Sequence, residues 1–218
     1  PIVYPETAFG LASVGQTILG LPDATAICLI VEDEPVILTR GRLISHERVL
    51  DFRTGVLERS FEWESPTGPR IRVRSRRLVS FEERCSIAFR LEIEVLSGRG
   101  RLGLSSLLLN HQGKEEAQHE LDPRRAAAIE GALEPLAWVS DEDRMSMLVR
   151  TRRSGMTAAC VAVNAVGGSR PSTVVQRSGQ FECAVDFAFD VVEGDRLTLD
   201  KLAAYSTGGP AVTSEAVL

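Results

Sequence analysis

Hydrophobic residues along this chain recur mostly at every second position, the period of a β-strand with one buried face. The clearest case is Val56–Arg77, where apolar residues alternate first with glutamates and then with arginines around a central Ser-Pro-Thr-Gly-Pro turn signal. If those five residues form the loop, Glu62 faces Arg72 and Trp63 faces Ile71. The pattern therefore predicts an antiparallel hairpin with opposite charges on one face and apolar pairs on the other.

The same alternation returns further along the chain. Short turn signals rich in Gly, Asp, Ser and Pro separate the segments, and no long helical pattern lies between them. Many strands with one charged face favour antiparallel pairing in a sandwich or barrel, so the expected fold class is all-β. The other expected strands are Ala26–Val31, Val36–Leu38, Ile87–Val95, Leu102–Leu109, Met145–Thr151, Thr157–Asn164, Phe181–Val191 and Leu197–Leu202.

Two stretches break the pattern. His111–Arg125 is polar and charged, which predicts a long exposed loop. Ser206–Leu218 is rich in small residues and contains Gly208-Gly209-Pro210, which is typical of a linker. We therefore expect one β-sandwich domain over residues 1–205 and a linker over residues 206–218.

Composition narrows the classes of partner. Hydrophobic residues make up 44% of the 218 residues and charged residues 25%, the balance of an ordinary globular protein. The formal net charge of −5 favours neither nucleic acid nor an anionic membrane surface as a partner. The longest apolar run, around Ala26–Val31, is far shorter than the roughly 20 residues that span a bilayer.

The four cysteines, Cys28, Cys85, Cys160 and Cys183, are widely spaced and form no CxxC pair. Each lies in or beside an apolar segment, which predicts buried free thiols rather than disulfides or a zinc site. The sequence shows no signal peptide, so we expect a reducing, cytoplasmic location.

A glycine-rich motif needs separate treatment. Gly98–Gly103 matches GxGxxG, and Asp122 follows 19 residues later, as in a dinucleotide site. That site requires a helix directly after the glycines, whereas only the short run Leu104–Asn110 precedes Gly113. We expect a hairpin turn here and no nucleotide.

Other polar residues also lack the arrangement that catalysis needs. His46, His111 and His119 do not have metal-ligand spacing. Asp186 and Asp190 would lie roughly 13 Å apart along one strand, too far for a pair of glycosidase carboxylates.

The acidic run at 141–143 is expected to form a turn. The Glu/Arg ladder of the hairpin indicates a solvated face of cross-strand ion pairs, with a domain-docking face as the alternative. No catalytic, cofactor-binding or metal-binding residue is assigned, and no cofactor is expected.

The segment His46–Arg59, followed by Trp63, resembles the R-x-L-D-x-R-x-G-x-L-x-R…W segment of glycoside hydrolase family 65. The resemblance covers nearly the whole chain and keeps the order of the family's segments. The other matching segments are Tyr4–Gly10, Gly15–Ile18, Pro22–Thr25, Arg72–Ser80 and Leu107–Gln112.

The resemblance implies a function for the parent protein. Members of this family are mostly inverting phosphorylases of α-glucosidic disaccharides such as maltose, trehalose or kojibiose, and a minority are hydrolases. They carry an N-terminal antiparallel β super-sandwich, similar to galactose mutarotase and with few short helices, before an (α/α)6 barrel that holds the catalytic glutamate and the phosphate-binding residues. An E-S-x-F-x-x-x-N-G stretch usually precedes the part matched here.

On this resemblance the chain is a non-catalytic N-terminal domain, excised from a larger enzyme, that supports and docks the barrel of the same polypeptide. The parent acts on a disaccharide, uses phosphate as a co-substrate and can be a homodimer. Within the family segment, Asp51 is expected to form charge-assisted hydrogen bonds with Arg48 and Arg53, and Gly55 to allow a turn.

Two other functions stay open at this stage. A carbohydrate-binding module would need exposed aromatic faces, for which Trp138, Tyr4 and Tyr205 are the candidates. A mutarotase-like epimerase would need an acid–base pair, for which His46 with Glu47 or Glu58 is the candidate.

Overall fold

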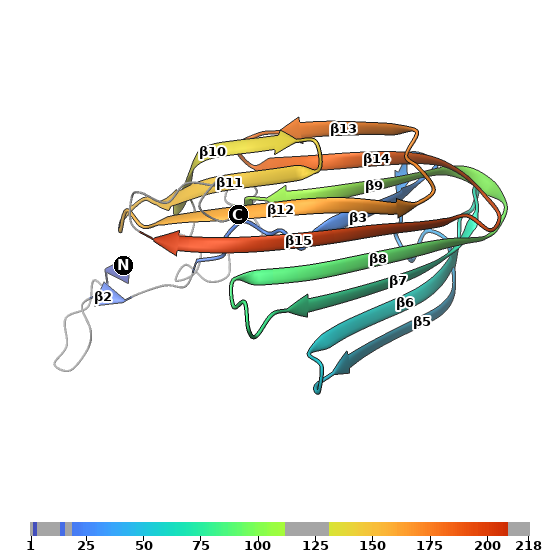
Figure 1. Cartoon of the computed structure of the whole chain (residues 1–218), viewed down its shortest axis with the longest axis horizontal. Helices are drawn as coiled ribbons and strands as arrows, with labels where there is room; N and C mark the ends of the chain where they lie inside the picture. Colours follow the sequence, from blue (N-terminus) through green and yellow to red (C-terminus); the bar gives the residue numbers. More distant parts are fainter. Residues whose placement is uncertain (1, 4–13, 16–18, 112–130, 209–218) are drawn as a thin grey trace.

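The computed structural model describes residues 2–3, 14–15, 19–111 and 131–208, and nearly all of its strands belong to two antiparallel sheets packed face to face (Figure 1). In spatial order, the larger sheet contains β10 (Leu133–Asp141), β11 (Arg144–Thr151), β12 (Thr157–Gly168), β15 (Arg196–Gly208), β8 (Ser86–Ser97), β7 (Arg70–Val79), β6 (Val56–Glu64) and β5 (Arg42–Asp51). The smaller sheet contains β13 (Thr173–Ser178), β14 (Glu182–Val192), β9 (Arg99–Leu109), β3 (Ile27–Val31) and β4 (Glu34–Pro35). Two short strands, β1 (Ile2–Val3) and β2 (Val14–Gly15), pair with each other.

This architecture confirms the predicted all-β antiparallel sandwich. Every pairing between the strands is antiparallel. The part of the chain that the structure describes contains no α-helix, so the few short helices expected are not found there. Within those same residues no helix has the length and apolarity of a membrane span.

The hairpin predicted from the Glu/Arg alternation forms in the predicted register. Glu62 pairs with Arg72 and Trp63 pairs with Ile71 across β6 and β7. The indole of Trp63 is 4% exposed and lies against the backbone of Gly41, where a Cβ atom would come within 2.3 Å of the ring. The apolar face of the hairpin therefore closes part of the core, as the alternation indicated.

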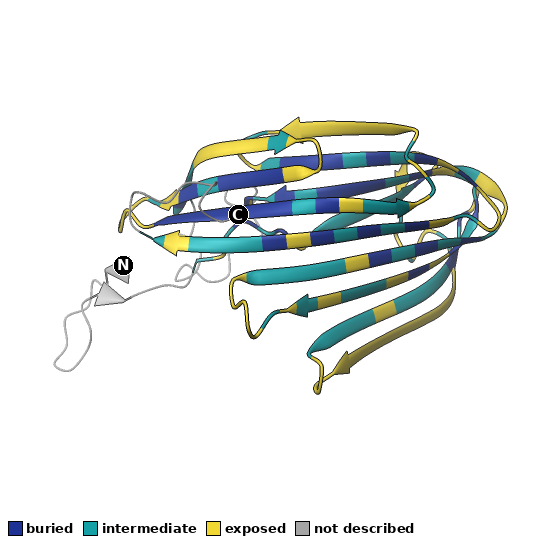
Figure 2. Ribbon diagram, viewed as in Figure 1, coloured by how far each residue is buried: buried dark blue, intermediate teal, exposed yellow. Residues whose placement is uncertain are grey.

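The core lies between the sheets and draws every second residue of the central strands (Figure 2). From the larger sheet come Ile93, Met147 and Leu199, and from the smaller sheet come Leu104 and Phe189, all at most 1% exposed. Burying side chains of this size stabilises a fold by about 1.5–3 kcal/mol each before entropy is counted. The period-two pattern is clearest in β8 and β14, whereas β12 is buried at six successive positions from Thr157 to Ala162.

The glycine-rich motif lies at a connection between the two sheets. Gly98, with a φ of 84°, joins β8 of the larger sheet to β9 of the smaller sheet. The predicted hairpin is therefore wrong, because β8 and β9 are not neighbours and the chain crosses from one layer to the other. No helix follows the glycines, since the residues after Gly98 form the strand β9.

Other turn predictions fare differently. Glu32 and Asp33 form a tight turn between β3 and β4 with φ values of 50° and 65°, and Glu142 has a positive φ in the acidic turn after β10. The predicted strand at Val36–Leu38 does not form, because the pairing with β3 ends at Pro35.

The start of the predicted linker needs correction, and the rest of the linker and most of the predicted loop lie outside the described residues. Ser206–Gly208, expected to open the linker, belong to β15 because Thr157, Ala158 and Ala159 of β12 pair with them. Residues 209–218 and most of the expected loop at 111–125 lie outside the described residues.

The four cysteines are all free, but only Cys160 and Cys183 are buried. Cys28 is half-buried and Cys85 is exposed, so the prediction of four buried thiols is wrong for these two. Cys85 lies in the turn between β7 and β8, where its neighbours in sequence are polar and charged. Burial raises the pKa of the Cys160 thiol to about 12 and also raises that of Cys183, which keeps both thiols protonated at neutral pH.

A buried lysine joins the two sheets. Lys201 on β15 has no exposed surface, and its Nζ donates to the carbonyl oxygens of Leu107 at 2.6 Å and Ala26 at 3.2 Å. Four residues along the same strand, the Tyr205 hydroxyl donates to the Pro22 carbonyl and accepts from the Ala24 N–H. These contacts bind the end of β15 to the segment that precedes β3.

Candidate functional site

The most open region of the molecule is the inner face of strands β5 to β8. The two sheets meet along β10 and β13, whereas β5, β6 and β7 spread away from the smaller sheet at the opposite side (Figure 1). A groove of about 600 Å³ lies there between the larger sheet and β3 with the segment after it. The smaller sheet does not extend over β5 to β7. Several inner-face side chains of these strands therefore line an open groove instead of packing in the core.

The groove has an apolar floor and one apolar wall. Leu57, Phe61 and Phe89 from the larger sheet line the floor, and Leu29 and Leu38 line the wall. All five are partly exposed in this chain. An apolar concave surface of this kind is typical of a binding groove rather than of a free surface.

The charged side chains among the described lining of the groove are all basic, and two of them, Arg76 and Arg90, are ion-paired with Glu92 and Asp200. Arg48 on β5 lies directly opposite Arg59 on β6 in the register of the two strands. On the next strand, β7, Arg77 lies opposite Leu57 and therefore belongs to the same face. The imidazole of His46 accepts a hydrogen bond from Arg59 Nε at 3.2 Å, and the Arg59 guanidinium lies 5.3 Å from the centre of the Phe61 ring. No Asp or Glu is among the lining residues in the part of the chain that the structure describes.

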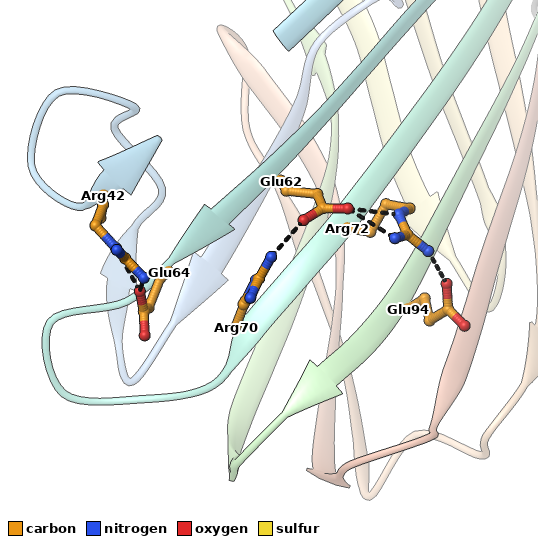
Figure 3. A network of polar contacts seen from close by, with 6 residues as sticks. All are labelled: Arg42, Glu62, Glu64, Arg70, Arg72 and Glu94. Carbon is orange, nitrogen blue, oxygen red and sulfur yellow. Dashed lines mark hydrogen bonds and ion pairs between the residues drawn. The ribbon is translucent and has the colours of Figure 1, made fainter. Parts of the chain in front are cut away.

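The outer face of the same strands has the opposite character. Glu62 binds Arg70 and Arg72 at 2.7 Å each, and Arg72 continues to Glu94 at 2.8 Å (Figure 3). The other pairs on this face are Arg42–Glu64, Arg74–Glu58, Arg76–Glu92, Arg90–Asp200 and Arg196–Glu94. The ladder is the face of cross-strand ion pairs that the sequence predicted, with the charges of one strand balanced by those of the next.

An apolar rim lies at one end of β5 to β8. We define it as Val49, Leu50, Phe52, Val79 and Phe81, which are between 47% and 91% exposed. Phe52 and Phe81 come from the two neighbouring turns, and the Phe81 ring lies 3.4 Å from the position a Cβ atom would take on Gly55. Clustered exposure of large apolar side chains marks an interaction surface. The sequence carries this signal only as two phenylalanines in otherwise polar turns.

The family segment around Asp51 forms the turn between β5 and β6. The Asp51 carboxylate accepts from the backbone N–H of Arg53 at 2.8 Å and from the hydroxyl of Thr54 at 2.9 Å, and these hydrogen bonds lower its pKa. The expected pairing with the guanidinium groups of Arg48 and Arg53 is therefore wrong, because the carboxylate is occupied within its own turn. Gly55 takes a φ of 72°, which confirms that it permits the turn.

The structure does not assemble the acid–base pair of the epimerase hypothesis. His46 faces the groove, since it pairs with Phe61, whereas Glu47 and Glu58 belong to the opposite face. Glu58 is bound there by Arg74 at 2.7 Å. No carboxylate therefore stands beside His46 within the groove.

The candidate sugar-stacking residues are dispersed. Trp138 on the edge strand β10 is 37% exposed, whereas the Tyr205 hydroxyl is held between Pro22 and Ala24. Tyr4 lies outside the described residues. Strands β11 and β12 separate Trp138 from Tyr205, so these two candidates form no shared platform.

The remaining polar candidates serve local structure. Asp186 is bound by Arg177 at 2.7 Å and by the Ser105 hydroxyl; burial raises its pKa, but these hydrogen bonds outweigh burial and hold the pKa below its ordinary value. His111 Nε2 lies 3.6 Å from a carboxylate oxygen of Asp23, and His119 lies outside the described residues. In the described part of the chain, no group of three or more His, Cys, Asp or Glu could hold a metal ion.

Comparison with known families decides where this domain belongs. Residues 3–217 match the model of the N-terminal domain of glycosyl hydrolase family 65. The chain belongs to this family. Its resemblance at His46–Arg59 is thus part of a match that runs almost from end to end.

Relatives of family 65 agree with this assignment. The chain is 33% identical over 159 residues to an uncharacterized glycosyl hydrolase of Mycobacterium tuberculosis, covering 73% of this chain and 20% of that protein. It is 27% identical over 213 residues to the α,α-trehalose phosphorylase of Thermoanaerobacter brockii, covering 94% and 26%. The chain therefore spans about a quarter of the length of these relatives or less.

A solved structure shares the fold. A candidate kojibiose phosphorylase from the human microbiome superimposes with a TM-score of 0.72 at 14% identity, over 91% of this chain and 24% of that one. The sandwich fold is thus shared although few residues are identical.

Proposed function

We propose that this chain is the non-catalytic N-terminal domain of an enzyme that phosphorolyses or hydrolyses α-glucosidic disaccharides, and that it supports and docks the catalytic domain of the same polypeptide. Relatives that carry the matching domain include an α,α-trehalose phosphorylase and a kojibiose phosphorylase, both about four times as long as the matched segment. In this proposal the sandwich extends through Gly208, the last residue of β15, and the chain after it leads to an (α/α)6 barrel. Phosphate is a co-substrate of the parent, and the domain itself holds no cofactor.

The apolar rim is the observation that supports a docking role. Phe52 is 91% exposed and Phe81 is 85% exposed, so each presents a large apolar ring to water in the isolated chain. Burying such side chains against a partner would stabilise the contact by roughly 25 cal/mol for each Å² of apolar surface removed from water. Contact with another domain of the same polypeptide would recover this free energy and fix the orientation of the sandwich.

Free cysteines support a reducing location for the parent enzyme. All four are unpaired, and buried Cys160 lies within the core strands where oxidation would disturb packing. We therefore place the enzyme in the cytoplasm.

The test uses the full-length polypeptide that contains this domain. Release of glucose 1-phosphate from trehalose, kojibiose and maltose is measured with phosphate, and release of glucose is measured without it. We expect turnover by the full-length enzyme and none by the isolated 218-residue chain.

A double variant, Phe52→Ser with Phe81→Ser, examines docking in the same enzyme. We expect it to lower the temperature at which the full-length enzyme loses activity, while Val139→Ser, at a 52% exposed position on the far edge strand β10, leaves that temperature unchanged. Turnover by the isolated chain would contradict the non-catalytic role, and an unchanged inactivation temperature in the double variant would contradict docking through the apolar rim.

A further inference from the structure

The arginines on the two faces of β5 to β8 differ in whether they form ion pairs. On the outer face, each of Arg70, Arg72, Arg74, Arg76 and Arg90 has a carboxylate partner within 2.8 Å. On the inner face, Arg48, Arg59 and Arg77 form no ion pair with any carboxylate among the residues that the structure describes. Within the described residues, a chain with a net charge of −5 therefore leaves three arginines of one groove without an ion pair.

The position of Arg48 opposite Arg59 makes this arrangement costly. Like charges placed directly opposite each other on antiparallel strands destabilise the pairing. The hydrogen bond from Arg59 to His46 does not relieve the repulsion, since an imidazole supplies no negative charge. An anionic group bound between the two guanidinium groups would remove the repulsion and satisfy their donors.

The shape of the groove indicates what carries that anion. Its volume of about 600 Å³ and its apolar floor at Leu57 and Phe61 far exceed the needs of an inorganic anion. Among the described residues that line it, no Asp or Glu would repel a negatively charged segment. Carboxylates fit the planar fork of arginine, and alternate residues of an extended segment point to opposite sides.

We propose that the groove binds an extended acidic segment of the catalytic domain of the same polypeptide. Its carboxylates pair with Arg48 and Arg59, Arg77 adds to the positive field, and its apolar side chains lie on Leu57 and Phe61. This inference rests on the proposed docking function and extends it, because it gives the groove a role distinct from that of the apolar rim.

The groove can be tested on the chain itself with a defined probe. Calorimetric titration uses a short blocked peptide in which glutamate alternates with leucine, and a peptide of the same length with glutamine in place of glutamate. We expect saturable binding of the glutamate peptide alone. Raising the salt concentration to about 0.5 M, where charges are screened beyond a few ångströms, should weaken it at least tenfold.

Charge variants locate the binding. Arg48→Glu with Arg59→Glu should weaken the glutamate peptide at least about tenfold, and Arg48→Gln with Arg59→Gln should do so without reversing the charge. Arg170→Glu, at an exposed arginine in the turn after β12, is the matched control and should leave binding unchanged. Circular dichroism melting confirms that the variants fold, which is expected because both groove arginines are exposed.

Several outcomes would overturn the inference. Equal binding of the glutamine peptide, no binding of the glutamate peptide, or equal affinity in the Arg48/Arg59 variants would each do so. Saturation by inorganic phosphate without peptide binding would identify a small-anion site instead. If the groove fails in these ways while Phe52→Ser with Phe81→Ser still weakens the full-length enzyme, the docking function stands and only the groove's role is lost.

Discussion

Lys201 Nζ lies 2.6 Å from the carbonyl oxygen of Leu107, so a fully buried ammonium group joins the larger sheet to the smaller one. Its hydrogen bonds to two carbonyl oxygens hold the charge, and Lys201 forms no ion pair with a carboxylate among the described residues, although the charge of Asp23 favours the ammonium form. Burial lowers the pKa of Lys201 from 10.5 to about 8, because the charged form is poorly solvated there.

The lowered pKa of Lys201 predicts that stability rises with pH in a defined window. Between about pH 8 and 10.5 the unfolded chain holds the proton that the folded chain has released, so raising the pH favours the folded state. Relative to Lys201→Met, the free energy of unfolding should increase by about 2 kcal/mol between pH 7 and 9.5. Comparing the two chains by urea denaturation cancels the opposing effect of the buried cysteines, and parallel pH profiles would contradict the prediction.

Gly41 beside Trp63 predicts a steric effect. A Cβ atom on Gly41 would come within 2.3 Å of the indole ring, so Gly41→Ala should displace the ring and cost about 1–3 kcal/mol. In a Trp138→Phe background, the emission of Trp63 should shift to longer wavelength as water reaches the ring. Gly20→Ala, which meets nothing within 4 Å, should change neither quantity.

The outer ladder predicts acid sensitivity of small size. Hydrogen bonds from Arg70 and Arg72 lower the pKa of Glu62, so the stabilisation it provides is present above its unfolded pKa near 4.5 and is lost as the pH falls through its folded pKa. Glu62→Gln should cost well under about 1 kcal/mol for each ion pair at neutral pH and should flatten the loss of stability below pH 4.5. Thermal melting at pH 3 to 7 in low salt measures both effects; a variant with an unchanged acid profile would exclude Glu62 as a contributor.

The apolar rim predicts how the isolated chain behaves. Phe52→Ser with Phe81→Ser should reduce self-association in light scattering without lowering the melting temperature, because both rings are almost fully exposed. Phe189→Ser provides the contrast: that ring has no exposed surface, and its loss should cost at least about 3 kcal/mol. Loss of stability in the rim variant would show that these rings support the sandwich itself.

How far the sequence predicted the fold depends on the position of each strand in its sheet. The sequence predicts the hairpin of β6 and β7 and the central strands β8, β9 and β14 from one buried face, and β12 from an apolar run that is buried on both faces. It does not predict the strands β5, β10 and β13, and all three lie at sheet edges where much of both faces is exposed (Figure 2). Register shifts near Leu43 in β5 and Pro135 in β10 weaken the alternation further.

The candidate site was harder to predict than the strands. The opposition of Arg48 and Arg59 depends on the register of β5, an edge strand that the alternation did not reveal. The groove also exists only because the smaller sheet ends before it reaches β5. The sequence of the larger sheet does not indicate how far the smaller sheet extends across it.

The place of β15 between β12 and β8 has a consequence for biosynthesis. During translation, β5 to β8 and β10 to β12 leave the ribosome as two separate groups of strands, because the strand that connects them is made last among the described residues. A nascent chain that stops before Arg196 would therefore present two unpaired edges, at β8 and at β12, to chaperones or to neighbouring chains.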